Sequence, residues 1–248
     1  MTKEFSLDEL WDSTPAGERV FGPRQVSGLP EAARRYLEHA IAPGTQLASA
    51  VRLRMHGEIK LKRWFPFRAE QVIRRERGMI WSATVRMRGI PVRGSDRLLD
   101  GRGTMRWKLF GIIPFLTASG PDITRSALGR VKAESVWLPS ALCGDDMSWT
   151  APDSSHCHAS FAVQGDSIKL ELTIDDTGRL DSVKCPRWGN PEGAQFHYVD
   201  FGGVVEEEGT FGGYTIPTRL RVGWYFGSDR FASQGEFFRV TIDDAEYR

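Results

Sequence analysis

A few polar side chains could carry chemistry in this 248-residue chain, and the carboxylates come first among them. Asp96 lies in VRGSDRL, where aspartate is disfavoured if the segment is a strand, and Arg93 and Arg97 flank it. Either Asp96 forms a surface ion pair, or it points inward as an acid whose ionised form a neighbouring arginine stabilises. Glu207, on the same strand face as Val205, could serve as a general acid or base if that face lines a cavity.

His197 and Tyr214 complete the predicted catalytic residues. His197 lies in QFHYVD beside another aromatic side chain, and either a pocket position or an ordinary surface or core position fits it. Tyr214 could offer one hydrogen bond from an otherwise apolar ring, or could simply belong to the core. The predicted substrate-binding residues are Trp81, Trp107, Arg130, Trp188, Phe211 and Trp224.

Familiar catalytic and cofactor motifs do not occur in the sequence. The GGV and FGGY segments lack the lysine and the glycine spacing of phosphate-binding loops, and there is no GxSxG elbow. His156 and His158 share a face if SHCH is a strand, but they are expected to be polar edge residues rather than metal ligands. We therefore expect neither a metal nor a cofactor.

One segment rich in aromatics and glycines predicts the elements that must position these residues. Residues 187–238 hold 12 of the 27 aromatic residues and 10 of the 26 glycines, in about a fifth of the chain. Glycine permits bulges and sharp bends in strands, and aromatic side chains fill the hollow that a bend creates. The segment predicts a strongly curved antiparallel sheet around an apolar interior.

Period-two alternation extends over most of the remaining chain. Trp81, Ala83 and Val85, for example, alternate with polar neighbours, and the pattern recurs from residue 51 to 110 and from 146 to 247. We expect a mainly β fold: a curved antiparallel half-barrel or barrel of roughly ten to twelve strands. The chain is expected to form a single domain, with a helical segment at 1–45 and the sheet at 46–248.

A helix at 120–137 interrupts the strands, because Ile123, Ala127 and Val131 recur at helical spacing. We expect this helix to cover the open, concave face of the sheet as a lid. Arg130 on the lid could then reach a carboxylate on the sheet and latch the cavity.

Positive and negative charges are unevenly distributed. Residues 1–110 carry 21 Lys and Arg against 12 Asp and Glu, a balance of +9, and residues 111–248 carry 12 against 20, a balance of −8. The basic half could attract an acidic carrier protein. In residues 51–62 the basic side chains alternate with apolar ones, as on the solvent face of a strand, so no nucleic-acid partner is expected.

The cellular location is judged from the apolar runs and the cysteines. No apolar run approaches the roughly 18–20 residues of a membrane span, so no membrane insertion is expected. The polar N-terminus lacks the apolar core of a signal peptide, which predicts a cytoplasmic protein. Three widely spaced cysteines without a CxxC motif indicate neither a disulfide framework nor a zinc site.

Several long motifs resemble a bacterial family of unknown function. They are RWGNPEG (187–193), FGG (201–203), TFGGYTIPTRL (210–220), GWYFG (223–227) and GEFFRVTIDDAEYR (235–248), with earlier matches in LPEAARRYL (29–37) and VRGSDRLLDGRGTMRWKL (92–109). That family resembles in outline the half-barrel lipoprotein carriers of the LolA type. The resemblance implies an antiparallel sheet that curls around an apolar cavity under helices, and it implies no reaction.

Two functions fit such a cavity. The first is a cofactor-independent enzyme, a cyclase or isomerase that holds a largely apolar, polyketide-like substrate and acts mainly through orientation. The alternative is a protein that binds a lipid or another hydrophobic ligand without transforming it. Carboxylates at the cavity would favour the enzyme, and an entirely apolar lining would favour the binding protein.

Overall fold

The computed structural model describes residues 5–144, 146–163 and 166–248. The helices are α1 (Leu7–Asp12), α2 (Pro23–Val26), α3 (Glu31–Ala40) and α4 (Pro121–Ala133), with the shorter helices η1 (Glu134–Trp137), η2 (Pro139–Cys143) and η3 (Phe231–Gly235). The strands are β1 (Ala50–Leu61), β2 (Arg63–Arg74), β3 (Gly78–Met87), β4 (Ile90–Leu99), β5 (Arg102–Leu109), β6 (Ile113–Ser119), β7 (Met147–Thr150), β8 (His156–Val163), β9 (Asp166–Ile174), β10 (Leu180–Gly189), β11 (His197–Phe211), β12 (Tyr214–Trp224) and β13 (Glu236–Tyr247).

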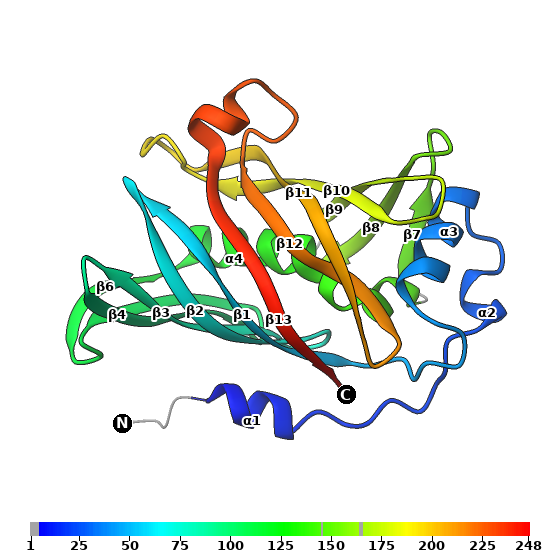
Figure 1. Ribbon diagram of the computed structural model, residues 1–248, viewed down its shortest axis with the longest axis horizontal. Helices are drawn as coiled ribbons and strands as arrows, with labels where there is room; N and C mark the ends of the chain where they lie inside the picture. Colours follow the sequence, from blue (N-terminus) through cyan, green and yellow to red (C-terminus); the bar gives the residue numbers. More distant parts are fainter. Residues whose placement is uncertain (1–4, 145, 164–165) are drawn as a thin grey trace.

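All thirteen strands form one antiparallel sheet, in the order β6-β5-β4-β3-β2-β1-β13-β12-β11-β10-β9-β8-β7. The first and last strands pair at its centre, with Val51 opposite Tyr247 and Ile59 opposite Phe238. The sheet curls into an open half-barrel (Figure 1), as the aromatic and glycine content predicts. Strands alternate as expected: Trp81, Ala83 and Val85 of β3 are buried on the concave side.

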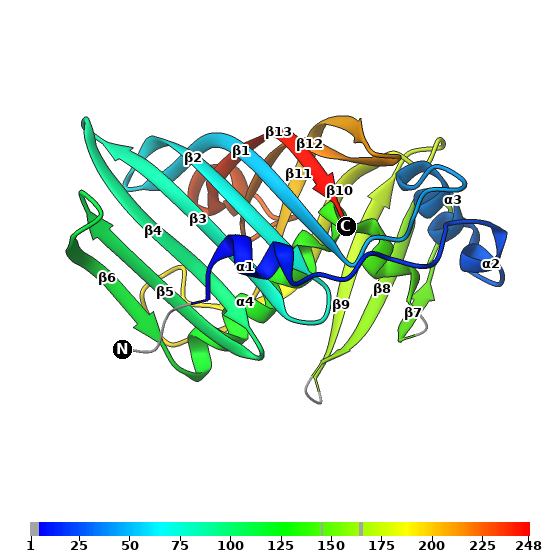
Figure 2. The same cartoon turned by 90° about the horizontal axis from the view of Figure 1, so that it is seen from below.

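Helix α4 connects the two halves of the sheet and lies across its concave face (Figure 2). Its main neighbours are β10 on one side and β5 on the other. Gly103 of β5 permits this approach, because a Cβ there would lie 2.6 Å from Cα of Thr124 on the helix. The predicted helix over the concave face is confirmed in place, with α4 ending at Ala133 and η1 continuing to Trp137.

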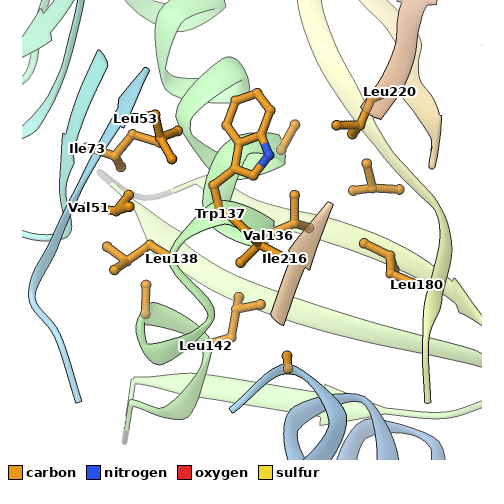
Figure 3. Close-up of a cluster of buried hydrophobic side chains, with 14 of the residues drawn as sticks. Val51, Leu53, Ile73, Val136, Trp137, Leu138, Leu142, Leu180, Ile216 and Leu220 are labelled. Atoms are coloured by element: carbon orange, nitrogen blue, oxygen red, sulfur yellow. The ribbon is translucent and has the colours of Figure 1, made fainter. Parts of the chain in front are cut away.

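The short helices that follow α4 fill the closed part of the half-barrel with apolar side chains. Trp137 lies at the centre of this core, between Leu53 and Ile73 on one side and Leu220 on the other (Figure 3). Its indole Nε1 donates to the carbonyl oxygen of Pro217 at 3.0 Å, so this buried polar atom is satisfied. The core anchors the C-terminal end of α4 against both halves of the sheet.

The two longer N-terminal helices pack in different places: α1 packs against Val72 and Ile80 outside the concavity, whereas α3 packs against η2, β8 and the main core. Helix α1 begins with a capping box, since Ser6 Oγ accepts from the Glu9 N–H and the Glu9 carboxylate accepts from the Ser6 N–H. In α3 one face is buried, including Tyr36 and Leu37. No helix within the described ranges is long and apolar enough to cross a bilayer.

Two details of the sheet differ from the sequence-based expectation. Strand β6 was not expected, because its residues Ile113–Ser119 show no alternation and most of its side chains are exposed. The sequence predicts two strands, at 195–200 and 204–211, but β11 is one strand of 15 residues, because Gly202 and Gly203 stay within the ladder instead of ending it. Gly202 faces the ring of Phe226, which would lie 2.8 Å from an added Cβ.

Candidate functional site

A cavity of about 370 Å³ lies between α4 and the concave face of the sheet. Aromatic rings supply much of its wall, among them Trp81, Phe201, Trp224, Phe237 and Phe238. Phe201 and Trp224 pack edge to face with ring centroids 5.2 Å apart, and Trp81 packs against Phe238 at 6.1 Å. Such a volume and such walls are typical of sites for small, largely apolar ligands.

One end of the cavity reaches the surface beside the β1–β2 turn. Leu61 lines the cavity and its side chain is also 43% exposed. Asn190, Pro191 and Phe196 from the β10–β11 loop line the cavity as well. The mouth is therefore bordered by loops at the ends of strands, while α4 and Trp137 line the cavity away from these loops.

A buried ion-pair network at the cavity joins α4 to the sheet. Arg130 of α4 places Nη1 3.0 Å from Asp96 Oδ2 and Nε 2.6 Å from Glu134 Oε1. The exposed fractions of the three side chains are 15%, 18% and 12%. Burial by itself lowers the pKa of Arg130, but the two carboxylates outweigh this effect and raise it above its ordinary value.

Each carboxylate oxygen of the network has a donor. Trp107 Nε1 donates to Asp96 Oδ1 at 3.0 Å, and Gln71 Nε2 donates to Glu134 Oε2 at 2.6 Å. The remaining two oxygens accept from Arg130. The guanidinium also lies 5.1 Å from the ring centroid of Trp81. The contact anticipated between the helix and a sheet carboxylate is therefore present, and the arginine beside Asp96 is Arg130 rather than Arg93 or Arg97.

A second arginine at the cavity, Arg187 of β10, is held differently. Its guanidinium stacks on Phe201 at 4.5 Å and on Trp224 at 5.0 Å, and its Nε donates to the Ser126 carbonyl oxygen at 3.1 Å. No carboxylate of the described chain lies within 4 Å of it. Burial, together with the nearby charge of Arg130, lowers the pKa of Arg187 to about 10. It remains a cation at neutral pH. The sequence predicts either a rim where Arg187 stacks on an indole or only a turn, and in the structure the indole that it stacks on is that of Trp224.

Two buried polar atoms at this site have no hydrogen-bond partner within the described ranges. They are the indole Nε1 of Trp81 and Oε1 of Gln71, on neighbouring residues of β3 and β2. Trp81 lines the cavity with its ring, while its Nε1 atom has less than 1 Å² of accessible surface. Of the predicted site residues, Asp96, Arg130, Trp81 and Trp224 come together here, with Trp107 directly behind Asp96.

Tyr214 and Phe211 lie far along their strands from this cavity, near the β11–β12 turn. The Tyr214 hydroxyl accepts from the Ala48 N–H at 2.8 Å and donates to the Gln46 carbonyl oxygen at 2.6 Å. Its ring stacks on Tyr247 with centroids 4.0 Å apart. These contacts make Tyr214 a core residue, and Phe211 is half-buried against the same core.

Glu207 and His197 lie on the surface, outside the cavity lining. The Glu207 side chain is 53% exposed and pairs with Arg219. Register shifts on both sides of Glu207 disturb the simple alternation that had suggested an inward direction. His197 is exposed at the first position of β11, and its Nδ1 lies 3.0 Å from the Gln195 carbonyl oxygen.

Trp188 lines a separate surface groove together with Asp122 and Tyr198. Its Nε1 donates to Asp122 Oδ1 at 2.8 Å, and it packs edge to face with Tyr198 at 5.0 Å. Arg125 stacks on its indole at 4.8 Å. Trp188 points away from the cavity because successive strand side chains alternate, and Arg187 takes the inward direction.

His156 and His158 lie close together on β8, but each contacts a different neighbour. His156 lies 2.8 Å from Asp153, and His158 lies 3.4 Å from the Thr150 hydroxyl. Over residues 5–144, 146–163 and 166–248, no group of three or more His, Cys, Asp or Glu side chains is arranged to hold a metal. All three cysteines are free thiols.

Comparisons with known proteins find one family and two structures to which this chain is similar. Residues 27–247 match the model of a family described as a family of unknown function (DUF6920). No curated protein matches the sequence. The predicted resemblance to a family of unknown function, with a LolA-like outline, is confirmed.

Two solved structures are similar in outline. One is a LolA superfamily protein from Nitrosomonas europaea, with a TM-score of 0.45 and 8% identity over 88% of this chain and 92% of that chain. The other is a domain assigned as an outer membrane lipoprotein-sorting protein from Vibrio parahaemolyticus, with a TM-score of 0.40 and 8% identity over 81% and 86%. The second of these neighbours is named for the sorting of outer membrane lipoproteins, which contradicts the predicted cytoplasmic location, so that prediction is withdrawn.

Proposed function

This chain belongs to the DUF6920 family of unknown function, and we propose that it binds an apolar, lipid-like ligand without transforming it. The observation that carries the proposal is the cavity of about 370 Å³ between α4 and the sheet, walled chiefly by aromatic and aliphatic side chains. Helix α4 and the sheet supply opposite walls, so an elongated apolar molecule would be enclosed along most of its length.

The polar groups at the cavity support an amphipathic ligand rather than a hydrocarbon. Arg187 lines the cavity with a positive charge, and no carboxylate of the described chain lies within 4 Å of it. A carboxylate or phosphate at one end of the ligand would pair with this guanidinium. We therefore infer a ligand with an apolar body and one anionic end.

The cavity carboxylates give little support to the cyclase or isomerase hypothesis. Asp96 and Glu134 line the cavity, as an enzyme would require, but protein donors already occupy all four of their oxygens. A general acid or base must have an oxygen within hydrogen-bond reach of the substrate proton. The paired carboxylates fit better as a structural tie between α4 and the sheet.

The test is direct binding of a fluorescent fatty acid to the full chain. Val222→Trp would fill the cavity, because Val222 lines it, and is expected to weaken binding at least tenfold. Val204→Trp is the matched control, because Val204 is also half-buried but does not line the cavity. This variant should bind the fatty acid as tightly as the parent does. Equal binding by the parent and a correctly folded Val222→Trp would exclude this cavity as the site.

The anionic end is tested with a fatty acid and the alcohol of the same chain length. Arg187→Gln should weaken fatty-acid binding by about tenfold or more and leave alcohol binding nearly unchanged, because a charged hydrogen bond contributes about 1.5–3 kcal/mol. Equal losses for both ligands would mean that Arg187 only supports the cavity wall.

A further inference from the structure

Three hairpin turns end side by side at one end of the sheet. They are the β1–β2, β3–β4 and β5–β6 turns, and they share an end because these six strands follow one another in an antiparallel meander. In Figure 2 the three turns lie together at the left of the sheet. We call residues 60–65, 86–93 and 108–116 the hairpin rim.

The hairpin rim exposes an unusual share of apolar surface. Nine large hydrophobic side chains are exposed in the described part of the chain, and seven of them belong to the rim. Ile112 is 74% exposed, and Phe110, Ile113 and Phe115 are each more than half exposed. The others are Leu61, Ile90 and Leu116. Scattered exposed hydrophobics need no explanation, but a contiguous group marks an interaction surface.

The charges of the rim all have one sign. Lys62, Arg63 and Arg88 are exposed at the turns, and Arg93 and Lys108 are exposed on neighbouring positions of β4 and β5. Residues 59–69, 86–93 and 106–117 contain no Asp or Glu. In the chain as described, none of these five cations lies within 4 Å of a carboxylate. The rim therefore attracts anions and is apolar at its tips.

The backbone of the turns supports a functional origin for this composition. Lys62, Arg88 and Phe110 have φ values of 71°, 53° and 53°, in the left-handed region where non-glycine residues are strained. Tight hairpin turns normally place Asn, Asp or Gly there, as Asp100 does at the opposite end of the sheet. At the rim the positions carry basic and aromatic side chains instead, and strained positions of this kind cluster at functional sites.

We propose that the hairpin rim binds the surface of an anionic lipid bilayer, with its apolar tips among the lipids and its cations at the headgroups. Peripheral membrane binding needs this combination of buried apolar area and attraction to anionic lipid. A bilayer also accepts tips from three separate turns without shape complementarity. The mode is adsorption to the surface and requires no spanning segment.

The rim adjoins the cavity through one residue. Leu61 belongs to the rim and lines the cavity near its mouth. If the proposed function is correct, a protein docked through the rim would hold the cavity mouth beside the bilayer. An apolar ligand could then pass between bilayer and cavity with little exposure to water.

The test is sedimentation of the full chain with vesicles of phosphatidylcholine, with and without 30 mol% phosphatidylglycerol. We expect binding to the anionic vesicles that falls at high salt and is weak without anionic lipid. Lys62→Gln combined with Arg63→Gln and Arg88→Gln should weaken it about 100-fold, since each basic residue near the surface contributes about 1 kcal/mol. Ile112→Ser combined with Phe115→Ser should weaken it about tenfold or more.

Val20→Ser is the matched control, because Val20 is 57% exposed far from the rim and its loss should not affect vesicle binding. Failure to bind anionic vesicles would overturn the proposal, as would binding that is insensitive to Ile112→Ser with Phe115→Ser. Binding to a soluble polyanion but not to vesicles would assign the rim to an acidic protein and also overturn it. Fatty-acid binding in solution should survive the rim substitutions, so failure of the cavity proposal would be seen separately.

Discussion

Replacing Arg130 by methionine should destabilise the protein by about 3 kcal/mol. Methionine keeps much of the side-chain volume but leaves Asp96 and Glu134 as two unpaired carboxylates, with exposed fractions of only 18% and 12%. Breaking a buried pair from one side costs about 3–5 kcal/mol, and the residual exposure of both acids places the expected loss at the lower end. Lost ion-pair hydrogen bonds of about 1.5–3 kcal/mol each give the same scale.

A compensated variant separates the loss of pairing from the loss of packing. Arg130→Met combined with Asp96→Asn and Glu134→Gln removes all three charges together. Each of the two new amide side chains retains an oxygen, which can accept from Trp107 at one position and from Gln71 at the other, so those hydrogen bonds survive. The combined variant should therefore be more stable than Arg130→Met alone, by about 1–2 kcal/mol.

Urea unfolding followed by far-ultraviolet circular dichroism measures both free energies of unfolding. The reasoning would be refuted if Arg130→Met lay within about 0.5 kcal/mol of the parent, or if the combined variant were the less stable of the two. Ligand release gives a second readout, because this network joins α4 to the sheet beside the cavity. Arg130→Ala should release a bound fluorescent fatty acid faster than the parent does.

Three further outcomes are expected. Burial raises the pKa of each cysteine thiol to about 12. The native protein should therefore react slowly with iodoacetamide at pH 8, and all three thiols should react after unfolding. Rapid labelling of the native protein would contradict this burial. The pKa of Asp153 is lowered to about 2, first through its hydrogen bond with His156, so this contribution to stability is complete above about pH 4 and is lost as pH falls through 2. An NMR titration of the carboxyl carbon should show the low midpoint, and His156→Ala should raise it. Gly103→Ala should destabilise the folded protein by about 1–3 kcal/mol, because the new methyl group would push α4 away from β5. Gly22→Ala is the control: its new methyl group would have its nearest neighbour 4.0 Å away, so this variant should unfold in urea like the parent.

Local patterns in the sequence predict much of the architecture. Alternation over β3 and the helical spacing of Ile123, Ala127 and Val131 are properties of short segments, so they can be recognised without knowledge of the fold. The aromatic and glycine content of 187–238 predicts the curvature for the same reason. Strand β6 was missed because exposed, unalternating residues give no period-two signal, although backbone pairing with β5 still forms the strand.

The candidate site depends on contacts between distant residues, which local sequence patterns do not predict. The partner of Asp96 is 34 residues away on another element, and its identity follows from how α4 crosses the sheet. Glu207 was assigned an inward direction by alternation alone, and the register shifts beside it cannot be read from side-chain types. The segment around Arg187 predicts a rim or only a turn, and only the fold shows that its guanidinium stacks on Phe201 and Trp224.

The pairing of β1 with β13 has a consequence for how the molecule can be assembled. Strand β13 lies between β1 and β12, and its pairing with β1 joins residues almost 200 positions apart in the chain. During synthesis, each half of the sheet has an unpaired edge until the residues of β13 leave the ribosome. Closing so long a loop is slow, so folding should be limited by this one late event. Chaperones that shield sheet edges would therefore affect the yield of this protein more than its final stability.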